Sequence, residues 1–390
     1  MSKVSIINCT SYEYETLSKA IDNLLAPLGG MAACIKPGEK ILIKPNLLGT
    51  NAPEEAVTTH PEVLRKVIRL VKQQGAIPVI GDNPALLNVE ETYNKTGISR
   101  IAKEENTELI YFANYSVNEY QITHPALKKL HLSKYALEVD GIINLPKFKT
   151  HGLTLLTMGI KNLYGLVPGM TKVEYHKIAH TPRYFTDMLS ELYKIVKPKL
   201  RLTIIDGIIG MDGEGPQEGR VRNFDLLMAA ADTVALDTIG YELFGINSAN
   251  VPLIIHCKNK NLGETKVSKI EIYDGDIKRF KIQNPLLSKT GFTSFIPEPL
   301  KDLIIRFFWV KPKIDRSKCK LCMKCVEICP MKTILKSGKI LVIKWDKCIS
   351  CFCCTEVCVH KAIETKESLI QTSARKTIHL IKKVFSKLSK

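Results

Sequence analysis

Residues 319–330 read Cys-Lys-Leu-Cys-Met-Lys-Cys-Val-Glu-Ile-Cys-Pro, so that four cysteines are spaced C-x2-C-x2-C-x3-C and are followed by proline. The same cysteine spacing returns twenty-nine residues later, over residues 348–358. The repeat extends beyond the cysteines, because Lys318 and Lys347 are separated by the same interval. This internal duplication predicts a small unit built from two equivalent halves.

The spacing within each half suits a cube of iron and sulfide. Two-residue gaps let one tight loop present three thiolates to adjacent irons, while the fourth cysteine, three residues further on, points toward a second cluster. The pattern resembles that of bacterial ferredoxins, and it predicts two [4Fe–4S] clusters as cofactors. The predicted ligands of cluster 1 are Cys319, Cys322, Cys325 and Cys358, and those of cluster 2 are Cys348, Cys351, Cys354 and Cys329.

Two structural zinc sites are the alternative interpretation of the eight cysteines. Zinc ribbons usually pair two C-x2-C knuckles across a longer loop, so the observed spacing favours iron–sulfur clusters. Two features depart from the ferredoxin pattern: Val359 replaces the second proline, and Cys353 is an additional thiol. We expect Cys353 to be a partly exposed bystander, with a redox or alternative-ligand role as the other interpretation.

Most cysteines are concentrated in this unit, since nine of the twelve lie between Cys319 and Cys358. Such clustering favours metal ligands over disulfides and favours a reducing compartment. Met1–Glu13 contains no apolar stretch typical of a secretory signal, and no run of eighteen apolar residues predicts a transmembrane helix. A cytoplasmic location is therefore expected.

The first 285 residues are expected to form an α/β layered domain. Short apolar segments alternate with amphipathic ones, a pattern typical of a mostly parallel sheet covered by helices. The expected strands are Lys40–Ile43, Ile77–Ile80, Gly141–Leu145, Leu202–Ile205 and Lys269–Tyr273, and the expected helices are Tyr12–Leu25, His60–Lys72, Pro182–Val196 and Asp232–Phe244. Because such sheets bind ligands at the carboxyl ends of their strands, the polar residues after each strand are the first candidates for a site.

Three further segments follow this domain. Residues 286–312 are a proline-containing linker, and residues 313–366 form the small α+β ferredoxin-like domain with two clusters. Residues 367–390 are predicted to form a basic amphipathic helix, because apolar residues recur every three or four positions among six basic residues from position 371 onward. This helix is expected to pack on its own protein or to make peripheral contact with an anionic membrane.

Several segments of the first domain resemble the family called domain of unknown function 362, whose members often carry a ferredoxin module. The matching segments are Ile41–Asn46, Val79–Pro84, Asn144–His151, Gly159–Gly165, Pro168–Gly169, Asp206–Pro216 and Asp232–Asp237. The resemblance covers roughly residues 3 to 245 and implies the fold without implying a particular reaction.

Residues 144–180 concentrate lysines and histidines, with Glu174 as the single acid. Such a segment suits an anionic substrate, such as a carboxylate or phosphate, or proton transfer coupled to reduction. The candidate catalytic residues are Lys147, His151 and Lys161, and the candidate anion-binding residues are Lys44, Asn46, Lys149, Asn162 and His176. The alternative is a solvated basic face.

Three aspartates follow or end predicted strands in the same domain. Asp82, Asp206 and Asp212 are candidates for binding a divalent metal. The alternative is that they cap helices or shape turns.

The formal net charge of +17 is compatible with nucleic acid, an anionic membrane, an acidic protein or an anionic small molecule as partner. Nucleic acid is not expected, because no recognisable nucleic-acid module accompanies the charge. The leading hypothesis is an oxidoreductase in which two clusters relay electrons to an anionic substrate in the α/β domain. The alternative hypotheses are an electron carrier or adaptor whose α/β domain docks a redox partner, and clusters that only staple the structure.

Overall fold

The computed structural model describes residues 1–84, 89–273, 276–291, 309–373 and 377. The strands of the first domain are β1 (Ser2–Asn8), β2 (Lys40–Pro45), β3 (Ile77–Gly81), β4 (Glu108–Ile110), β5 (Val117–Gln121), β6 (Lys129–Ser133), β7 (Gly141–Leu145), β8 (Lys147–His151), β9 (Leu155–Thr157), β10 (Leu200–Asp212), β11 (Arg220–Ala230) and β12 (Ile270–Tyr273). Its α-helices are α1 (Tyr14–Leu25), α2 (Pro61–Gln73), α3 (Val89–Lys95), α4 (Ile98–Glu104), α5 (Lys134–Glu138), α6 (Gly159–Asn162), α7 (Thr171–Ile178), α8 (Pro182–Val196), α9 (Thr233–Leu243) and α10 (Pro252–Asn259).

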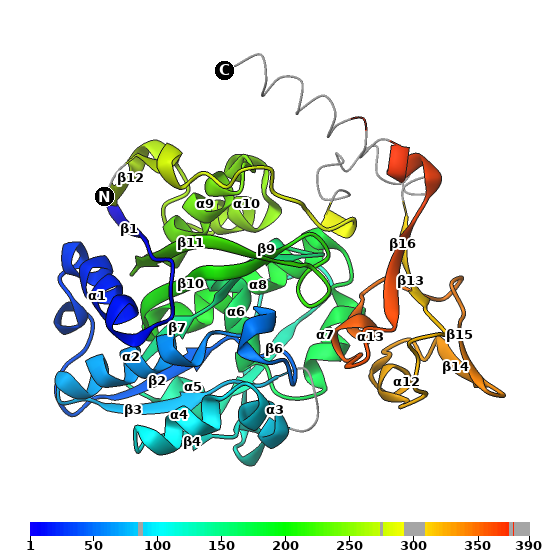
Figure 1. Ribbon diagram of the computed structural model, residues 1–390, viewed down its shortest axis with the longest axis horizontal. Helices are drawn as coiled ribbons and strands as arrows, with labels where there is room; N and C mark the ends of the chain where they lie inside the picture. The colour runs from blue at the N-terminus through cyan, green and yellow to red at the C-terminus, as the bar shows by residue number, and fades with distance from the viewer. Residues whose placement is uncertain (85–88, 274–275, 292–308, 374–376, 378–390) are drawn as a thin grey trace.

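A single large sheet organises this domain, in the order β12-β1-β11-β10-β7-β2-β3-β4, with β8 attached to β10 and β9 to β8 (Figure 1). Among the described strands of this sheet, six of the nine pairings are parallel. The predicted mostly parallel α/β sheet is therefore confirmed. The central strand β7 is buried along its whole length, as expected for a parallel strand covered on both faces.

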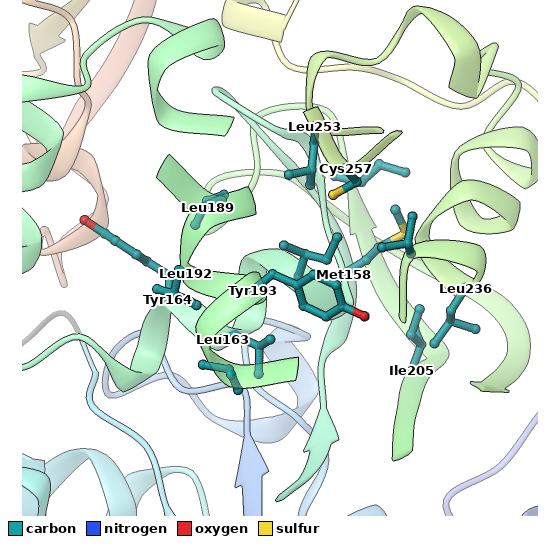
Figure 2. Packing of buried hydrophobic residues seen from close by; sticks show 14 of the residues in the cluster. Met158, Leu163, Tyr164, Leu189, Leu192, Tyr193, Ile205, Leu236, Leu253 and Cys257 are labelled. Carbon is teal, nitrogen blue, oxygen red and sulfur yellow. The ribbon is translucent and has the colours of Figure 1, made fainter. Parts of the chain in front are cut away.

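Helices cover both faces of the sheet. Side chains alternate along β2, so that Ile41 and Ile43 enter one core with α1, α2 and α4, while Leu42 enters the other with α8 and α9. Figure 2 shows part of this second core, where Met158 and Tyr193 pack near Leu236.

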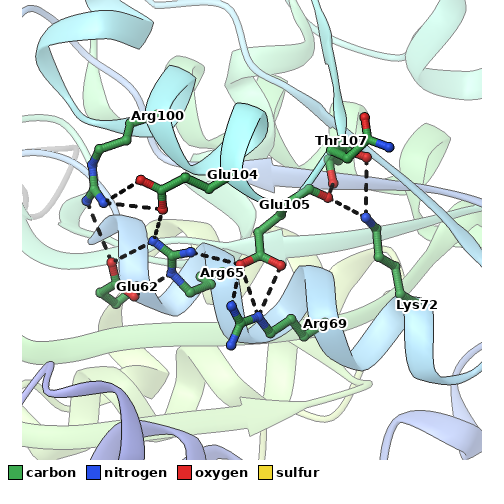
Figure 3. A network of polar contacts seen from close by, with 9 residues as sticks. Glu62, Arg65, Arg69, Lys72, Arg100, Glu104, Glu105 and Thr107 are labelled. Carbon is green, nitrogen blue, oxygen red and sulfur yellow. Dashed lines mark hydrogen bonds and ion pairs between the residues drawn. The ribbon is translucent and has the colours of Figure 1, made fainter.

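A network of ion pairs joins α2 to α4 on the surface of the first face (Figure 3). Arg65 contacts Glu62, Glu104 and Glu105, and Arg69 contacts Glu105 as well. The two pairs with an exposed member, Arg65–Glu104 and Arg69–Glu105, each contribute little to stability, roughly 0–1 kcal/mol. The network joins α2 to the end of α4 and includes no residue of the basic segment 144–180.

Strand β10 is longer than its predicted extent, which ended at Ile205. It continues through two glycines to Asp212 and pairs with β11 over most of that length. A Cβ atom at Gly210 would lie 2.2 Å from the carbonyl oxygen of Phe148. The absence of a side chain at Gly210 therefore permits the close approach of β8 to β10.

The second domain contains β13 (Val310–Ile314), α12 (Lys324–Ile328), β14 (Ile334–Ser337), β15 (Ile340–Ile343), α13 (Cys353–Glu356) and β16 (Ile363–Glu367). β13 pairs with β16 and β14 with β15, both antiparallel. This gives the predicted small α+β unit beside the large sheet, with α13 near α7 (Figure 1). The first strand begins at Val310, inside the segment predicted to be a linker.

Parts of two predicted segments lie outside the described residues: most of the linker, at 292–308, and most of the basic tail, at 374–376 and 378–390. The amphipathic helix of the tail and its membrane contact therefore stay predictions. In the part of the chain that the structure describes, no helix is long and apolar enough to cross a membrane.

Candidate functional site

The two cysteine-containing loops have the same backbone conformation. Non-glycine residues with positive φ occur in pairs related by the sequence repeat: Leu321 and Ser350 (54° and 54°), Met323 and Phe352 (64° and 60°), and Lys332 and Lys361 (51° and 48°). A left-handed residue turns successive backbone N–H groups toward one point, which suits binding of an anion such as a sulfide-rich cluster. The duplication seen in the sequence is thus also present in the loop geometry.

The eight motif cysteines divide into two groups in space. One cavity is lined by Cys319, Cys322, Cys325 and Cys358, and the other by Cys329, Cys348, Cys351 and Cys354. Each group combines three cysteines of one motif with the last cysteine of the other. The structure thus brings together the two sets of four that the sequence predicted.

The surroundings of these sulfurs fit thiolate-bound iron–sulfur cubes. The N–H of Thr333 donates to Cys329 Sγ and the N–H of Ala362 donates to Cys358 Sγ, both at 3.3 Å. Such bonds stabilise thiolate ligands and tune a cluster. The four sulfurs of each group line a cavity, which is the arrangement that a cube of iron and sulfide needs.

A small pocket lies between the two domains, with a volume of about 70 Å³. This is several times the roughly 10–15 Å³ that one water needs. Its polar lining residues from the first domain are Asn46, Asp82, Asn83, Lys161, Asn162, Tyr164, Lys172 and His176, and those from the second domain are Cys353 and Glu356. Asn46 and Asp82 come directly after β2 and β3, at the carboxyl edge of the sheet where ligands are expected.

Three polar atoms of buried pocket residues have neither a hydrogen-bond partner nor an ion-pair partner among the described residues: Asn46 Oδ1, Asn162 Oδ1 and His176 Nδ1. The orientation of Asn162 is determined, because its Nδ2 donates to Asn144 Oδ1 at 2.8 Å and to the carbonyl of Pro45 at 3.3 Å. Burial lowers the pKa of His176 to about 3, so its ring is neutral. Buried polar atoms are normally satisfied, and these atoms indicate a site for a polar ligand.

Two lysines provide the positive charge of the small pocket. The Lys161 ammonium lies 5.1 Å from the ring of Tyr164 and forms no ion pair with a described residue. Lys172 donates to the carbonyl of Asn83, and desolvation lowers its pKa to about 7. Glu356 faces them from α13, and burial raises the pKa of its carboxyl group. The pocket can thus accept an anionic group together with a hydrogen-bond donor.

Asp237 of α9 positions the helix that carries Lys161 and Asn162. Its carboxylate accepts the N–H groups of Gly159 (2.8 Å) and Ile160 (3.0 Å) at the start of α6. A Cβ at Gly159 would lie 2.2 Å from Thr233 Cγ2, so only glycine allows α6 to approach α9 this closely. Burial raises the pKa of Asp237 to about 7.

This raised pKa predicts a pH-dependent contribution to stability. In the folded protein Asp237 keeps its proton up to about pH 7, whereas the unfolded chain releases it near pH 4. Its stabilisation is therefore complete below about pH 4 and is lost as the pH rises through about 7. Relative to Asp237→Asn, which does not titrate, the wild-type free energy of unfolding should fall by about 1.4 kcal/mol per pH unit within this window.

Thermal unfolding of both proteins under anaerobic conditions, from pH 5 to pH 8, measures this difference. The gap should change up to about pH 7 and stay constant above it. A gap of constant size over the whole range would contradict the assignment.

Lys147, a predicted catalytic residue, lines neither interdomain pocket. Its ammonium lies 2.8 Å from Asp206 Oδ2 and donates to the Tyr12 hydroxyl at 2.8 Å, and both members of the ion pair are fully buried. Tyr12 in turn donates to Asp206 Oδ1 and stacks on His60. The Lys147 ammonium thus binds Asp206 and Tyr12 inside the first domain and does not face either interdomain pocket.

Replacing Lys147 with methionine should strongly destabilise the protein. Asp206 would remain buried without its cation, which costs about 3–5 kcal/mol. Lys66→Met is the matched control, because its partner Asp22 is 53% exposed and the pair should contribute less than about 1 kcal/mol. Denaturant midpoints of the two variants should differ accordingly, and adding Asp206→Asn should recover part of the loss; equal midpoints would contradict this role.

Other predicted residues also lie outside the small pocket. Lys44 is paired with Asp82 at 2.7 Å, and Lys149 donates to the carbonyl of Val57. The three aspartates considered for a metal are separated into different ion pairs, with Asp212 held by two arginines. Each of the three carboxylates has a cationic partner, and none of them belongs to a group of side chains in the described part of the chain that could hold a metal ion.

His151 lines a larger interdomain pocket of about 460 Å³. Its Nδ1 accepts the N–H groups of Leu153 and Thr154, which leaves Nε2 as the protonated nitrogen. Cys351, Phe352 and Glu356 of the second domain line this pocket too. Glu356 therefore borders both pockets.

Sequence reasoning missed two residues of the site. Cys353 is 4% exposed and lines the small pocket, whereas it was expected to be a partly exposed bystander. Nothing in the sequence distinguished Glu356, because the equivalent position of the first repeat is also a glutamate, Glu327. In the structure Glu327 is exposed. The additional cysteine, Cys353, was the one sequence feature that could have pointed to this side of the pocket.

These features define the class of protein. The chain is an iron–sulfur electron-transfer protein in which an α/β domain is joined to a ferredoxin-like module. Residues 311–359 match the 4Fe-4S dicluster domain, in agreement with the predicted [4Fe–4S] cofactors. Residues 41–242 match the domain of unknown function DUF362, and the chain belongs to this family.

A relative, the thylakoid-associated protein sll1697 of Synechocystis sp. PCC 6803, is 35% identical over 266 residues, covering 68% of this chain and 81% of its own. Two solved structures show distant likeness. The lactate racemase apoprotein of Thermoanaerobacterium thermosaccharolyticum has a TM-score of 0.37 at 16% identity, covering 61% of this chain and 56% of its own. A Thermotoga maritima protein has a TM-score of 0.35 at 12% identity, covering 53% and 52%.

Proposed function

We propose that the protein is an oxidoreductase that transfers electrons between two [4Fe–4S] clusters and a small anionic substrate bound in the small interdomain pocket. The observation that carries this proposal is the shared pocket wall. α13, which contains the cluster 2 ligand Cys354, faces Lys161 and Lys172 across a space lined by unsatisfied polar atoms.

The clusters, when bound by the eight motif cysteines, supply single electrons. The residues of the chain bind and orient the substrate. Lys161 and Lys172 pair with its anionic group, because neither forms an ion pair with a described residue. Asn46 and Asn162 accept hydrogen bonds from its donor group.

Contacts between the two domains support a fixed geometry for this transfer. Lys361 pairs with Glu55 at 2.9 Å, and Thr365 donates to Glu214 at 2.8 Å. Lys289 donates to Thr365 on the same side. Such contacts keep the clusters close to the pocket. They add to the effect of the covalent linkage, which already holds the two domains at a high effective concentration.

The proposed location is the cytoplasm, where thiols stay reduced. All twelve cysteines are free. Thiolates, rather than disulfides, are the ligands that iron–sulfur clusters need.

Anaerobically purified protein, reduced with dithionite and freed from excess reductant, provides the test. Small carboxylates and phosphate esters are added singly, and reoxidation of the clusters is followed by visible absorbance. An oxidoreductase should be reoxidised by at least one such compound with formation of a reduced product. If none reoxidises it while an acceptor protein does, the carrier or adaptor alternative replaces this proposal.

A further inference from the structure

The two cluster cavities differ in what surrounds them. The cavity of cluster 2 has no charged lining residue in the described part of the chain, and two of its residues, Cys351 and Phe352, also line the 460 Å³ interdomain pocket. The first domain therefore covers this side of the module. Cluster 2 is also next to the proposed substrate site, because its ligand Cys354 lies on α13 between Cys353 and Glu356, which line the small pocket.

The cavity of cluster 1 is bordered by exposed and cationic side chains. Its ligand Cys322 is exposed, and Lys320, Lys324 and His360 line the same cavity. No described acidic side chain lines it, and neither lysine forms an ion pair with a described residue. A protein partner can thus approach cluster 1 closely, and an acidic partner is favoured.

An open groove continues from this cavity, because Ile314 and Leu341 line both. Its apolar lining includes the exposed Val342 together with Ile343 and Trp345, and its charged lining includes Arg316. The acids of the groove, Asp315 and Glu364, are both paired with Lys318 at 3.3 and 2.8 Å. Exposed apolar side chains combined with charged ones are typical of a protein-binding surface.

We propose that this surface, defined by Lys320, Lys324, His360 and the adjoining groove, docks an acidic one-electron carrier protein, so that electrons are exchanged with cluster 1 and with the substrate at cluster 2. This inference rests on the proposed function and adds the partner and the direction of the relay. A second copy of the chain is disfavoured as occupant, since its net charge of +17 repels the same surface.

Binding of a plant-type [2Fe–2S] ferredoxin, chosen for its acidic surface, to the oxidised holoprotein tests the proposal. Calorimetry at low and high ionic strength should give an affinity that falls with salt. The double variant Lys320→Glu/Lys324→Glu should bind at least about tenfold more weakly, mainly through slower association. The control Lys95→Glu/Lys103→Glu changes the net charge equally on exposed positions of α3 and α4 and should bind like wild type.

Several results would overturn the proposal. They are equal weakening by both double variants, wild-type binding by the Lys320/Lys324 variant, and affinity that is independent of salt. Binding to phosphatidylserine vesicles but not to the ferredoxin would assign the surface to membranes instead. If the glutamate variant loses its visible cluster absorbance, Lys320→Gln/Lys324→Gln is used, and it should weaken binding about threefold or more. Dithionite reduces the clusters without a partner, so the substrate experiment can fail or succeed independently of this one.

Discussion

Replacing Cys358 with alanine is expected to remove cluster 1, although Cys358 belongs to the second motif. The structure places it with Cys319, Cys322 and Cys325 around one cavity. The reducible [4Fe–4S] signal should fall by about half, because each cluster accounts for half of the iron. Anaerobic iron and sulfide analysis with electron paramagnetic resonance measures this loss.

The spectrum that remains identifies which cluster was lost. Cys358→Ala should leave the same spectrum as Cys319→Ala, and a different one from Cys348→Ala, which removes a residue of the other cavity. Cys353→Ala is the matched control and should keep the full iron content, since four other cysteines line the cluster 2 cavity. If Cys358→Ala resembled Cys348→Ala, the exchange of ligands between halves would be wrong.

Replacing Lys161 with methionine should reduce substrate affinity and turnover by about ten- to a hundredfold. The lysine faces the small pocket without a carboxylate partner among the described residues, so its loss removes a charge-assisted hydrogen bond of about 1.5–3 kcal/mol. Stability should not decrease, because removing a desolvated cation relieves a cost. Burial lowers the pKa of Lys161, which is consistent with this cost.

Lys177→Met is the matched control for this variant. It lies in the same basic segment, on α7, but is exposed and does not line the pocket. Cluster reoxidation by the substrate found in the screen, measured for both variants, separates pocket residues from surface charge. Equal loss in the two variants would show that the segment acts only as a solvated basic face.

The basic segment shows how far residue type alone could locate the site. Lys147 and Lys161 looked equivalent in the sequence, yet the first is buried against Asp206 and the second faces the pocket. The difference depends on Asp206, which is 59 residues away on another strand. His176 lines the small pocket, whereas His180 of the same segment is exposed.

Features that depend on neighbouring residues were determined by the sequence itself. The cysteine spacing specified both loops and their repeat, since ligands three residues apart are presented by one tight turn. Apolar alternation likewise specified the mostly parallel sheet, because burial on two faces requires apolar strands between helices.

Tertiary structure alone decided the features that depend on contacts between distant segments. Gly210 lies inside β10 and lets β8 approach closely, and Cys353 is buried because α7 and the loop after β2 cover α13. The interdomain pocket exists only once both domains are folded and in contact. Its charges, unsatisfied atoms and neighbouring cluster come from segments far apart in the chain, and no local pattern encodes which of them meet.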